Sequence, residues 1–216
     1  MRRFDLSLYL VTDPLLAGPR GVVETVRQAL DGGVTIVQLR DPEAKTRALV
    51  ETAAALLEVT RPRGVPLIIN DRVDVMLAVG ADGVHVGAND MEPAVARRLA
   101  GPDAIVGRSI TTLDELRETD LAGVDYIGAS PVFSTPTKTD TGPELGLEGL
   151  KRLRAATTLP IVGIGRINAE NARAVIEAGA DGVAVVSAIM AAADPAAAAR
   201  AISGATGLSS FPYRKK

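Results

Sequence analysis

The sequence predicts an α/β protein, a single (β/α)8 TIM barrel, on three observations. Short runs of Val, Ile, Leu and Ala alternate with longer segments that carry apolar residues three and four positions apart. Both kinds of segment occur eight times, the number that closes such a barrel. The length of 216 residues lies near the short end for this fold. An open, doubly wound sheet is the alternative, but eight units are more than it usually needs.

The predicted strands are nearly continuous in apolar residues, as expected for parallel strands buried on both faces. We expect strands at 6–12, 35–40, 66–70, 83–87, 104–110, 126–130, 160–165 and 182–189. The intervening helices are expected at 22–30, 43–59, 73–79, 93–100, 113–121, 147–156, 169–178 and 195–202. We predict one catalytic domain over residues 1–216, with a flexible tail at 209–216.

A short motif, Gly-Ala-Asp-Gly-Val, occurs at 80–84 and again at 179–183. In both copies a helical pattern ends, glycine provides a left-handed cap, and a strand begins. We expect these loops at the amino-terminal face of the barrel, where they serve stability. Convergence of short helix-to-strand loops on such residues is favoured over an internal repeat as the explanation of the motif.

Composition excludes several classes of function. Lys and Arg number 24 and Asp and Glu 26, so a net charge of −2 argues against a general binder of nucleic acid or acidic membranes. The absence of Cys and the single His exclude disulfides, thiolate nucleophiles and two-histidine sites. Neither a membrane span nor a secretory signal is visible, so a cytoplasmic location is predicted.

Active sites of these barrels form at the carboxyl ends of the strands. Two carboxylates, Asp71 and Asp90, follow neighbouring predicted strands. Converging carboxylates repel unless a cation or proton lies between them, and Mg²⁺ suits such oxygen ligands. The alternative is that each Asp caps the helix that follows it.

Cationic residues follow the same strand ends. Arg40 and Lys138, with Arg72 as a further candidate, would face the carboxylates, and together with Mg²⁺ they would form a diphosphate pocket. The alternative is that they are ordinary surface cations. The long connection at 131–146, which holds Lys138, is expected to be functional because loops of this length are rare in compact barrels.

The last two predicted strands end in a pattern typical of phosphate sites. Gly163, Gly165, Val186 and Ser187 could offer backbone N–H groups to a phosphate. The alternative is that the glycines are needed for packing alone. The single histidine, His85, is interpreted as an interior barrel residue with satisfied hydrogen bonds rather than as an acid or base.

These residues resemble the thiamine-phosphate synthase family over nearly the whole chain. The matching segments are Val37-Gln38-Leu39-Arg40-Asp41, Ile68-Ile69-Asn70-Asp71-Arg72, Gly83-Val84-His85-Val86-Gly87, Thr135-Pro136-Thr137-Lys138 and Gly182 to Ser187. The Thr-Pro-Thr-Lys and Ile-Asn-Asp-Arg elements are the specific ones.

The resemblance implies a transferase of thiamine biosynthesis. A hydroxymethylpyrimidine diphosphate would lose diphosphate with the help of Mg²⁺, and the nitrogen of a thiazole phosphate would then attack the methylene carbon. An electron-rich aminopyrimidine would stabilise a benzyl-like cation, so we expect the diphosphate to leave before the attack. Such chemistry needs charge stabilisation and positioning more than acid–base groups.

The resemblance also implies roles for individual positions. Asp71 and Asp90 would bind Mg²⁺, and Arg40, Ser109 and Lys138 would be the catalytic residues. The implied substrate-binding residues are Gln38, Leu39, Arg40, Asn70, Ser109, Thr135, Thr137, Lys138, Gly165, Val186 and Ser187.

The sequence departs from the family at three positions. Pro42 stands where the family has Lys, Ala88 where it has Gln, and Arg166 where it has the second Gly of a Gly-Gly turn. Lys45 is a candidate to replace the missing cation, and Arg166 to contact the monophosphate.

Two alternatives to the synthase remain. A related thiazole tautomerase shares the fold, but its proton transfers call for an acid–base side chain. A non-catalytic barrel that binds phosphorylated ligands is the other. In each case the expected partners are small molecules, with no nucleic acid and no membrane, and exposed helix faces could carry a homodimer interface.

Overall fold

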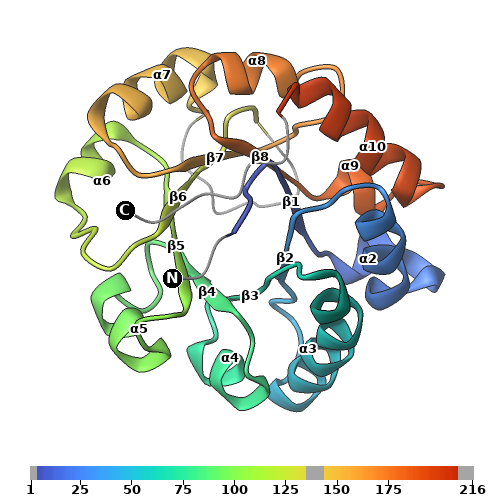
Figure 1. The fold of residues 1–216 in the computed structure, drawn as a ribbon. Coiled ribbons are helices and arrows are strands. Elements are labelled where there is room, and N and C mark those ends of the chain that lie inside the picture. The colour runs from blue at the N-terminus through green and yellow to red at the C-terminus, as the bar shows by residue number, and fades with distance from the viewer. Residues whose placement is uncertain (1–3, 135–143, 209–216) are drawn as a thin grey trace.

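The computed structural model describes residues 4–134 and 144–208. Eight parallel strands form a closed barrel in which each strand pairs with the next and β8 pairs with β1 (Figure 1). The strands are β1 (Leu8–Val11), β2 (Ile36–Leu39), β3 (Leu67–Asn70), β4 (Gly83–Val86), β5 (Ile105–Ile110), β6 (Tyr126–Ala129), β7 (Ile161–Ile164) and β8 (Gly182–Val185). The predicted (β/α)8 barrel is therefore confirmed, and the open sheet is excluded.

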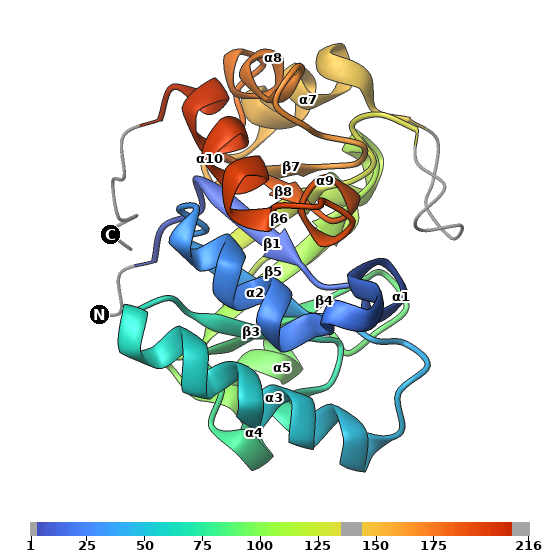
Figure 2. The ribbon, with the colours of Figure 1, turned by 90° about the vertical axis from the view of Figure 1, so that its right-hand side faces the viewer.

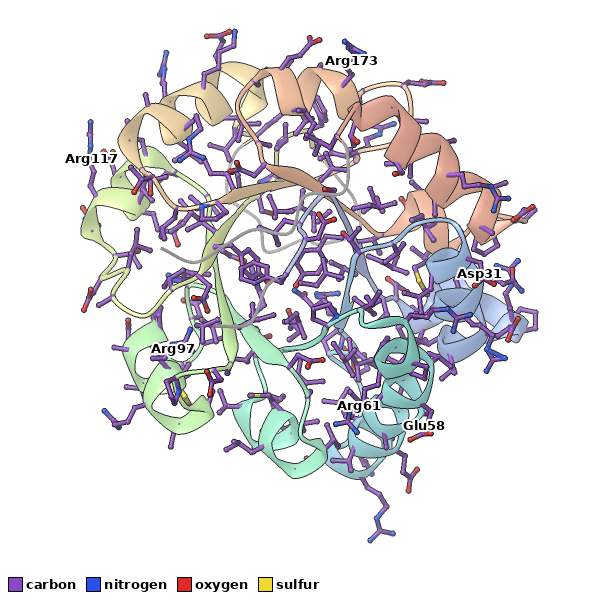
Figure 3. All side chains as sticks on the ribbon, in the orientation of Figure 1. Asp31, Glu58, Arg61, Arg97, Arg117 and Arg173 are labelled. Carbon is purple, nitrogen blue, oxygen red and sulfur yellow. The ribbon has the colours of Figure 1, made fainter. Side chains whose placement is uncertain are left out.

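A ring of helices surrounds the strands (Figure 1). The helices that connect successive strands or close the ring are α2 (Val22–Asp31), α3 (Thr46–Thr60), α4 (Val73–Val79), α5 (Pro93–Ala100), α6 (Leu113–Glu118), α7 (Gly146–Ala156), α8 (Ala172–Glu177) and α10 (Pro195–Thr206). Figure 3 shows that the labelled charged side chains, among them Arg117 and Arg173, belong to this outer ring. No helix in the part of the chain that the structure describes is long and apolar enough to span a bilayer.

Four short elements were not predicted: α1 (Pro14–Ala17), η1 (Gly18–Arg20), η2 (Arg61–Arg63) and α9 (Ser187–Met190). Helix α1 lies beyond the carboxyl end of β1 (Figure 2). It begins there because the Asp13 carboxylate accepts the N–H groups of Leu15 and Leu16, and Pro14 supplies the first helical residue.

The predicted strand 182–189 was too long. The chain leaves the barrel after Val185, and α9 follows, with Met190 N–H donating to Val186 C=O at 2.9 Å. A run of Val, Ala and Ile suits a buried strand and a buried helix turn equally, so periodicity alone could not place this boundary. The predicted helix at 43–59 also begins later, at Thr46, because Asp41 accepts the N–H groups of Glu43 and Ala44 in a turn.

The Gly-Ala-Asp-Gly-Val motif forms the same loop in both places. Gly80 and Gly179 have φ of 65° and 106°, in the region that favours glycine. The motif's Asp reaches across to the previous strand: Asp82 accepts Leu67 N–H at 2.8 Å, and Asp181 accepts Ile161 N–H at 2.8 Å. Both loops lie where strands begin, so they stabilise the amino-terminal face, as expected.

Two separate cores result. One fills the layer between strands and helices and includes Leu39 and Ile69. The other lies inside the barrel and consists of Phe4, Leu6, Tyr9, Val11, Ile36, Ile68, Ile105, Tyr126, Val162 and Ala184. Alternate residues of each strand point to one core or the other, because side chains alternate along a β-strand.

Candidate active site

A pocket opens at the carboxyl ends of the barrel strands. The space between its walls is about 950 Å³ when the open solvent at its mouth is included. The residues that line it are Tyr9, Val11, Thr12, Gln38, Arg40, Asn70, His85, Ser109, Tyr126, Gly128, Ser130, Val162, Ile164, Gly165, Arg166, Ile167, Ala184, Val185, Val186 and Ser187. Every strand of the barrel, or the loop that follows it, contributes to this lining.

Seven of the predicted substrate-binding residues line this pocket: Gln38, Arg40, Asn70, Ser109, Gly165, Val186 and Ser187. Leu39 does not, because it points away from the barrel interior and is buried among core residues next to the helices. Thr135, Thr137 and Lys138 lie outside the described residues. The predicted tail at 209–216 also lies outside them.

The pocket floor carries a continuous chain of hydrogen bonds. Gln38 Nε2 donates to Tyr9 Oη at 2.8 Å, and Tyr9 Oη lies 2.8 Å from Tyr126 Oη. His85 continues the chain through Nδ1, 3.0 Å from Tyr126 Oη, and through Nε2, 2.9 Å from Ser109 Oγ. Burial raises the pKa of both tyrosine hydroxyls, so they remain neutral.

His85 is thus an interior residue with both ring nitrogens engaged, as the sequence predicted. It also lines the pocket, which the interpretation as a core residue did not include. Tyr9 and Tyr126 were missed altogether. Their signal in the sequence is a phenol within a strand that is otherwise mostly aliphatic, because a buried tyrosine hydroxyl needs a partner.

Asp71 and Asp90 both lie beside the end of β4. The Asp71 N–H donates to His85 C=O at 2.8 Å, and Asp90 Oδ2 accepts Gly87 N–H at 2.9 Å. The helix-capping interpretation is wrong for both. Helix α4 has Arg72 and α5 has Glu92 at the N-cap, and neither helix has a side-chain cap hydrogen bond.

Asp71 has a φ of 60°, in the left-handed region, although it is not glycine. Asn70 Nδ2 donates to Asp71 Oδ2 at 2.6 Å and helps to hold this conformation. Positive φ is uncommon outside glycine, although Asp adopts it more readily than most residues, and such conformations are concentrated at functional sites.

The donor set fits Mg²⁺. Two carboxylates on adjacent strand ends match a cation that takes one or two protein carboxylates and completes its shell with substrate phosphates and water. Among residues 4–134 and 144–208, no group of three or more His, Cys, Asp and Glu side chains is placed to enclose a metal ion. An ion here would therefore depend on a phosphorylated ligand for its remaining oxygens.

Arg40 and Arg72 differ in the hydrogen-bond partners of their guanidinium groups. Within the described part of the chain, the Arg40 guanidinium has no hydrogen-bond acceptor, and it lines the pocket. Arg72 is paired with Asp74, with Nη2 2.6 Å from Oδ2, and it also donates to Thr46 Oγ1. The Arg72 guanidinium lowers the pKa of Asp74 by this hydrogen bond. The prediction that Arg72 faces the carboxylates is not supported by these contacts.

The glycines at the carboxyl end of β7, Gly163 within it and Gly165 after it, have packing reasons of their own. A Cβ on Gly163 would lie 2.6 Å from Val175 Cγ1, and one on Gly165 would lie 2.8 Å from Phe133 C=O. Gly165 nevertheless lines the pocket beside Arg166, Val186 and Ser187. Lys45, the proposed replacement for the missing lysine, is exposed just before α3 and is not a lining residue of this pocket.

Comparisons with known proteins show the family of this chain. The family model described as thiamine monophosphate synthase matches residues 8–189. A thiamine-phosphate synthase of Azorhizobium caulinodans is 58% identical over 199 residues, covering 92% of this chain and 94% of the relative. One from Xanthobacter autotrophicus is 56% identical over 202 residues, covering 94% and 96%.

Among solved structures, a thiamine phosphate pyrophosphorylase from Pyrococcus furiosus superposes with a TM-score of 0.84. It is 42% identical, and the match covers 94% of this chain and 96% of that one. The family model covers more than half of the chain, and the relatives are similar over almost their full length. The chain therefore belongs to the thiamine monophosphate synthase family.

Proposed function

We propose that this chain joins a hydroxymethylpyrimidine diphosphate to a thiazole phosphate, giving thiamine phosphate and diphosphate. The observation that carries the proposal is the pocket itself. It brings Gln38, Arg40, Asn70 and Ser109 from one side of the barrel together with Gly165, Val186 and Ser187 from the other. One wall would serve the pyrimidine diphosphate and the other the thiazole phosphate.

The pyrimidine diphosphate is assigned to the side formed by β2, β3 and β5. Arg40 offers a guanidinium with no acceptor among the described residues, and its planar fork suits the oxygens of a diphosphate. Lys138 is proposed as a second cation. Arg40 and Lys138 then stabilise the negative charge that develops on the leaving diphosphate.

Asp71 and Asp90 are the residues that would hold Mg²⁺. A bound Mg²⁺ would neutralise charge on the diphosphate and so make it a better leaving group. Asn70 serves this arrangement by holding one oxygen of Asp71. With few protein ligands at hand, the metal and the diphosphate are expected to bind together.

The thiazole phosphate is assigned to the side formed by the loops after β7 and β8. Gly165, Val186 and Ser187 line that side, and Thr135 and Thr137 are proposed to join them. Arg166, exposed at the rim, is proposed as the cation for the monophosphate. The chain's part in bond formation is to hold the thiazole nitrogen near the methylene carbon as the diphosphate leaves.

The synthase is favoured over a tautomerase and over a non-catalytic barrel. The relatives from Azorhizobium caulinodans and Xanthobacter autotrophicus carry the name of the synthase. In addition, both nitrogens of the single histidine are hydrogen-bonded to Tyr126 and Ser109, so neither is free to exchange a proton directly with a ligand.

A coupling assay tests the proposal. Purified protein is mixed with both phosphorylated half-molecules, with and without Mg²⁺, and thiamine phosphate and diphosphate are quantified. We expect equal amounts of both, only when Mg²⁺ is present. Product at the same rate after complete removal of divalent metal would refute the metal assignment, and no product under any condition would refute the proposed function.

Two arginine variants localise the effect. Arg40→Ala is expected to lower kcat by about 10²- to 10³-fold, as when one charge-stabilising group is removed from an active site. Arg173→Ala is the matched control, because Arg173 is 73% exposed on α8 and pairs with Glu177 of the same helix. Equal activity of the two variants would show that Arg40 does not act in this site.

A cytoplasmic location and a homodimer belong to the same proposal. Both accord with an enzyme that acts on small phosphorylated molecules. Light scattering of the purified protein measures the mass in solution, and a monomer at working concentration would contradict the dimer.

A further inference from the structure

Arg20 holds the segment that follows the last barrel strand. Its Nη1 donates to Ala192 C=O at 3.0 Å, and its Nη2 donates to Ala193 C=O at 3.0 Å. These two carbonyls lie in the turn between α9 and α10. Arg20 is not one of the described residues that line the pocket, and the coupling reaction as proposed gives it no role.

The contact crosses the seam of the barrel. Arg20 ends η1, in the connection after β1, whereas α9 follows β8. Because β8 pairs with β1 and closes the barrel, the loops after the first and the last strand become neighbours. Helix α9 consequently packs beside α1 and α2, and α2 and α9 lie side by side in Figure 1. The guanidinium thus joins two segments that are 172 residues apart in the chain.

A tight turn presents Arg20 to this partner. Gly21 N–H donates to Gly18 C=O at 3.1 Å, and Gly18 and Gly21 have φ of 55° and 76°. Pro19 lies between them, and its ring fixes its own φ. Because the backbone around Arg20 is held in this way, the planar guanidinium loses little further freedom when it bonds both carbonyls.

Helix α9 depends on support from outside. It has four residues, Ser187–Met190, and a single helical turn has little stability of its own. Val186 precedes it directly, and both Val186 and Ser187 line the pocket. Ile189 is buried in the core between strands and helices, but apolar packing has no preferred direction. The paired bonds from Arg20 are directional, so they fix where the segment after α9 lies.

We propose that Arg20 is a positioning residue for the thiazole phosphate. By fixing the turn after α9, it sets the place of Val186 and Ser187 in the pocket wall. The identity of the ligand rests on the proposed function, which assigns this wall to the thiazole phosphate and the opposite wall to the pyrimidine diphosphate. Loss of Arg20 therefore weakens the use of one substrate and leaves that of the other intact.

Steady-state kinetics with both phosphorylated half-molecules and Mg²⁺ test the proposal. In Arg20→Ala the KM for the thiazole phosphate should rise about tenfold, the loss expected from one net hydrogen bond, whereas kcat and the KM for the pyrimidine diphosphate should stay unchanged. Arg20→Lys keeps the charge but lacks the planar fork that bonds both carbonyls, so its KM for the thiazole phosphate should be intermediate. A merely structural role would change both KM values alike.

Arg61→Ala is the matched control. Arg61 Nη2 also donates to a backbone carbonyl at the end of a helix, Gly80 C=O after α4, at 2.9 Å. This bond lies at the amino-terminal face of the barrel, at the opposite end from the pocket. Its loss should leave both KM values unchanged.

Hydrogen exchange gives a second readout that needs no substrate. The amides of α9 should exchange faster in Arg20→Ala than in the wild-type protein, and at the wild-type rate in Arg61→Ala. A raised KM for the thiazole phosphate without faster exchange in α9 would mean that Arg20 acts on the ligand directly, which would overturn the positioning role.

The outcomes separate the two proposals. If the wild-type protein forms no thiamine phosphate, the proposed function is overturned, and the inference with it. If the wild-type protein is active and Arg20→Ala leaves the KM for the thiazole phosphate unchanged, or raises both KM values equally, the positioning role alone is overturned.

Discussion

Removal of the Asp125 carboxylate should destabilise this barrel far more than removal of Asp181, although the two occupy equivalent places. Asp125 accepts Val106 N–H at 2.9 Å and pairs with Arg97. Asp181 accepts Ile161 N–H at 2.8 Å and pairs with Arg154. Each therefore links one helix to the start of a barrel strand.

Burial is what separates the two positions. The Asp125 side chain is 3% exposed and that of Arg97 16%, whereas Asp181 is 47% exposed and Arg154 29%. Asp125→Ala leaves a buried strand N–H without its acceptor and a largely buried guanidinium with only neutral backbone carbonyls as acceptors. Breaking a buried pair from one side typically costs about 3 to 5 kcal/mol.

The same change at Asp181 leaves groups that water can reach. A surface ion pair is worth about 0 to 1 kcal/mol, and a net hydrogen bond about 0.5 to 1.5 kcal/mol. We therefore expect Asp181→Ala to cost about 1 to 2 kcal/mol. Asp125→Asn should fall between the alanine variants, because an amide oxygen can still accept Val106 N–H while the charge is lost.

The measurement is urea unfolding at pH 7, followed by far-ultraviolet circular dichroism, with the free energy of unfolding compared among the four proteins. The free energy of unfolding of a typical domain is about 5 to 15 kcal/mol, so each variant should still fold. If Asp125→Ala and Asp181→Ala cost the same within error, burial would not be what determines the strength of these links, and the reasoning would fail.

Three further results are expected. Above pH 10 the unfolded chain releases the protons of Tyr9 and Tyr126, whereas the native chain retains them because burial raises the pKa of both tyrosines. The free energy of unfolding should therefore fall by about 1.4 kcal/mol per pH unit for each tyrosine. Urea unfolding at several alkaline pH values measures this slope, and tyrosinate absorbance from either residue before unfolding would contradict the prediction. Gly182→Ala should lower the free energy of unfolding by at least about 3 kcal/mol, because the added Cβ would overlap the backbone just before β1. Normal soluble yield with an unchanged urea midpoint would be inconsistent with that overlap. Asp74→Asn should cost less than about 1 kcal/mol, because its pair with Arg72 is solvent-exposed; a larger change in unfolding free energy would show that the pair is shielded in solution.

Local patterns were sufficient for most of the fold. Two helices, α4 and α5, have the predicted bounds, because a proline or a capping glycine marks their ends. Strand positions were right to within a few residues for the first seven strands. The end of β8 was wrong, since the same apolar residues suit a strand or a buried helical turn.

The sequence by itself determined the barrel, its order of elements and the end of the barrel that carries the site. These follow from local periodicity and from the rule that parallel strands place their carboxyl ends together. That is why strand-end residues such as Gln38, Arg40 and Ser109 could be named from local pattern and resemblance alone. Only the tertiary structure decided which side chains meet inside. Tyr9 and Tyr126 are 117 residues apart in the chain, yet their hydroxyls bond because barrel closure places β1 and β6 around one interior. No local sequence pattern specifies a contact between residues so far apart in the chain. The same barrel closure brings Gln38, His85 and Ser109 into the hydrogen-bonded floor of the pocket.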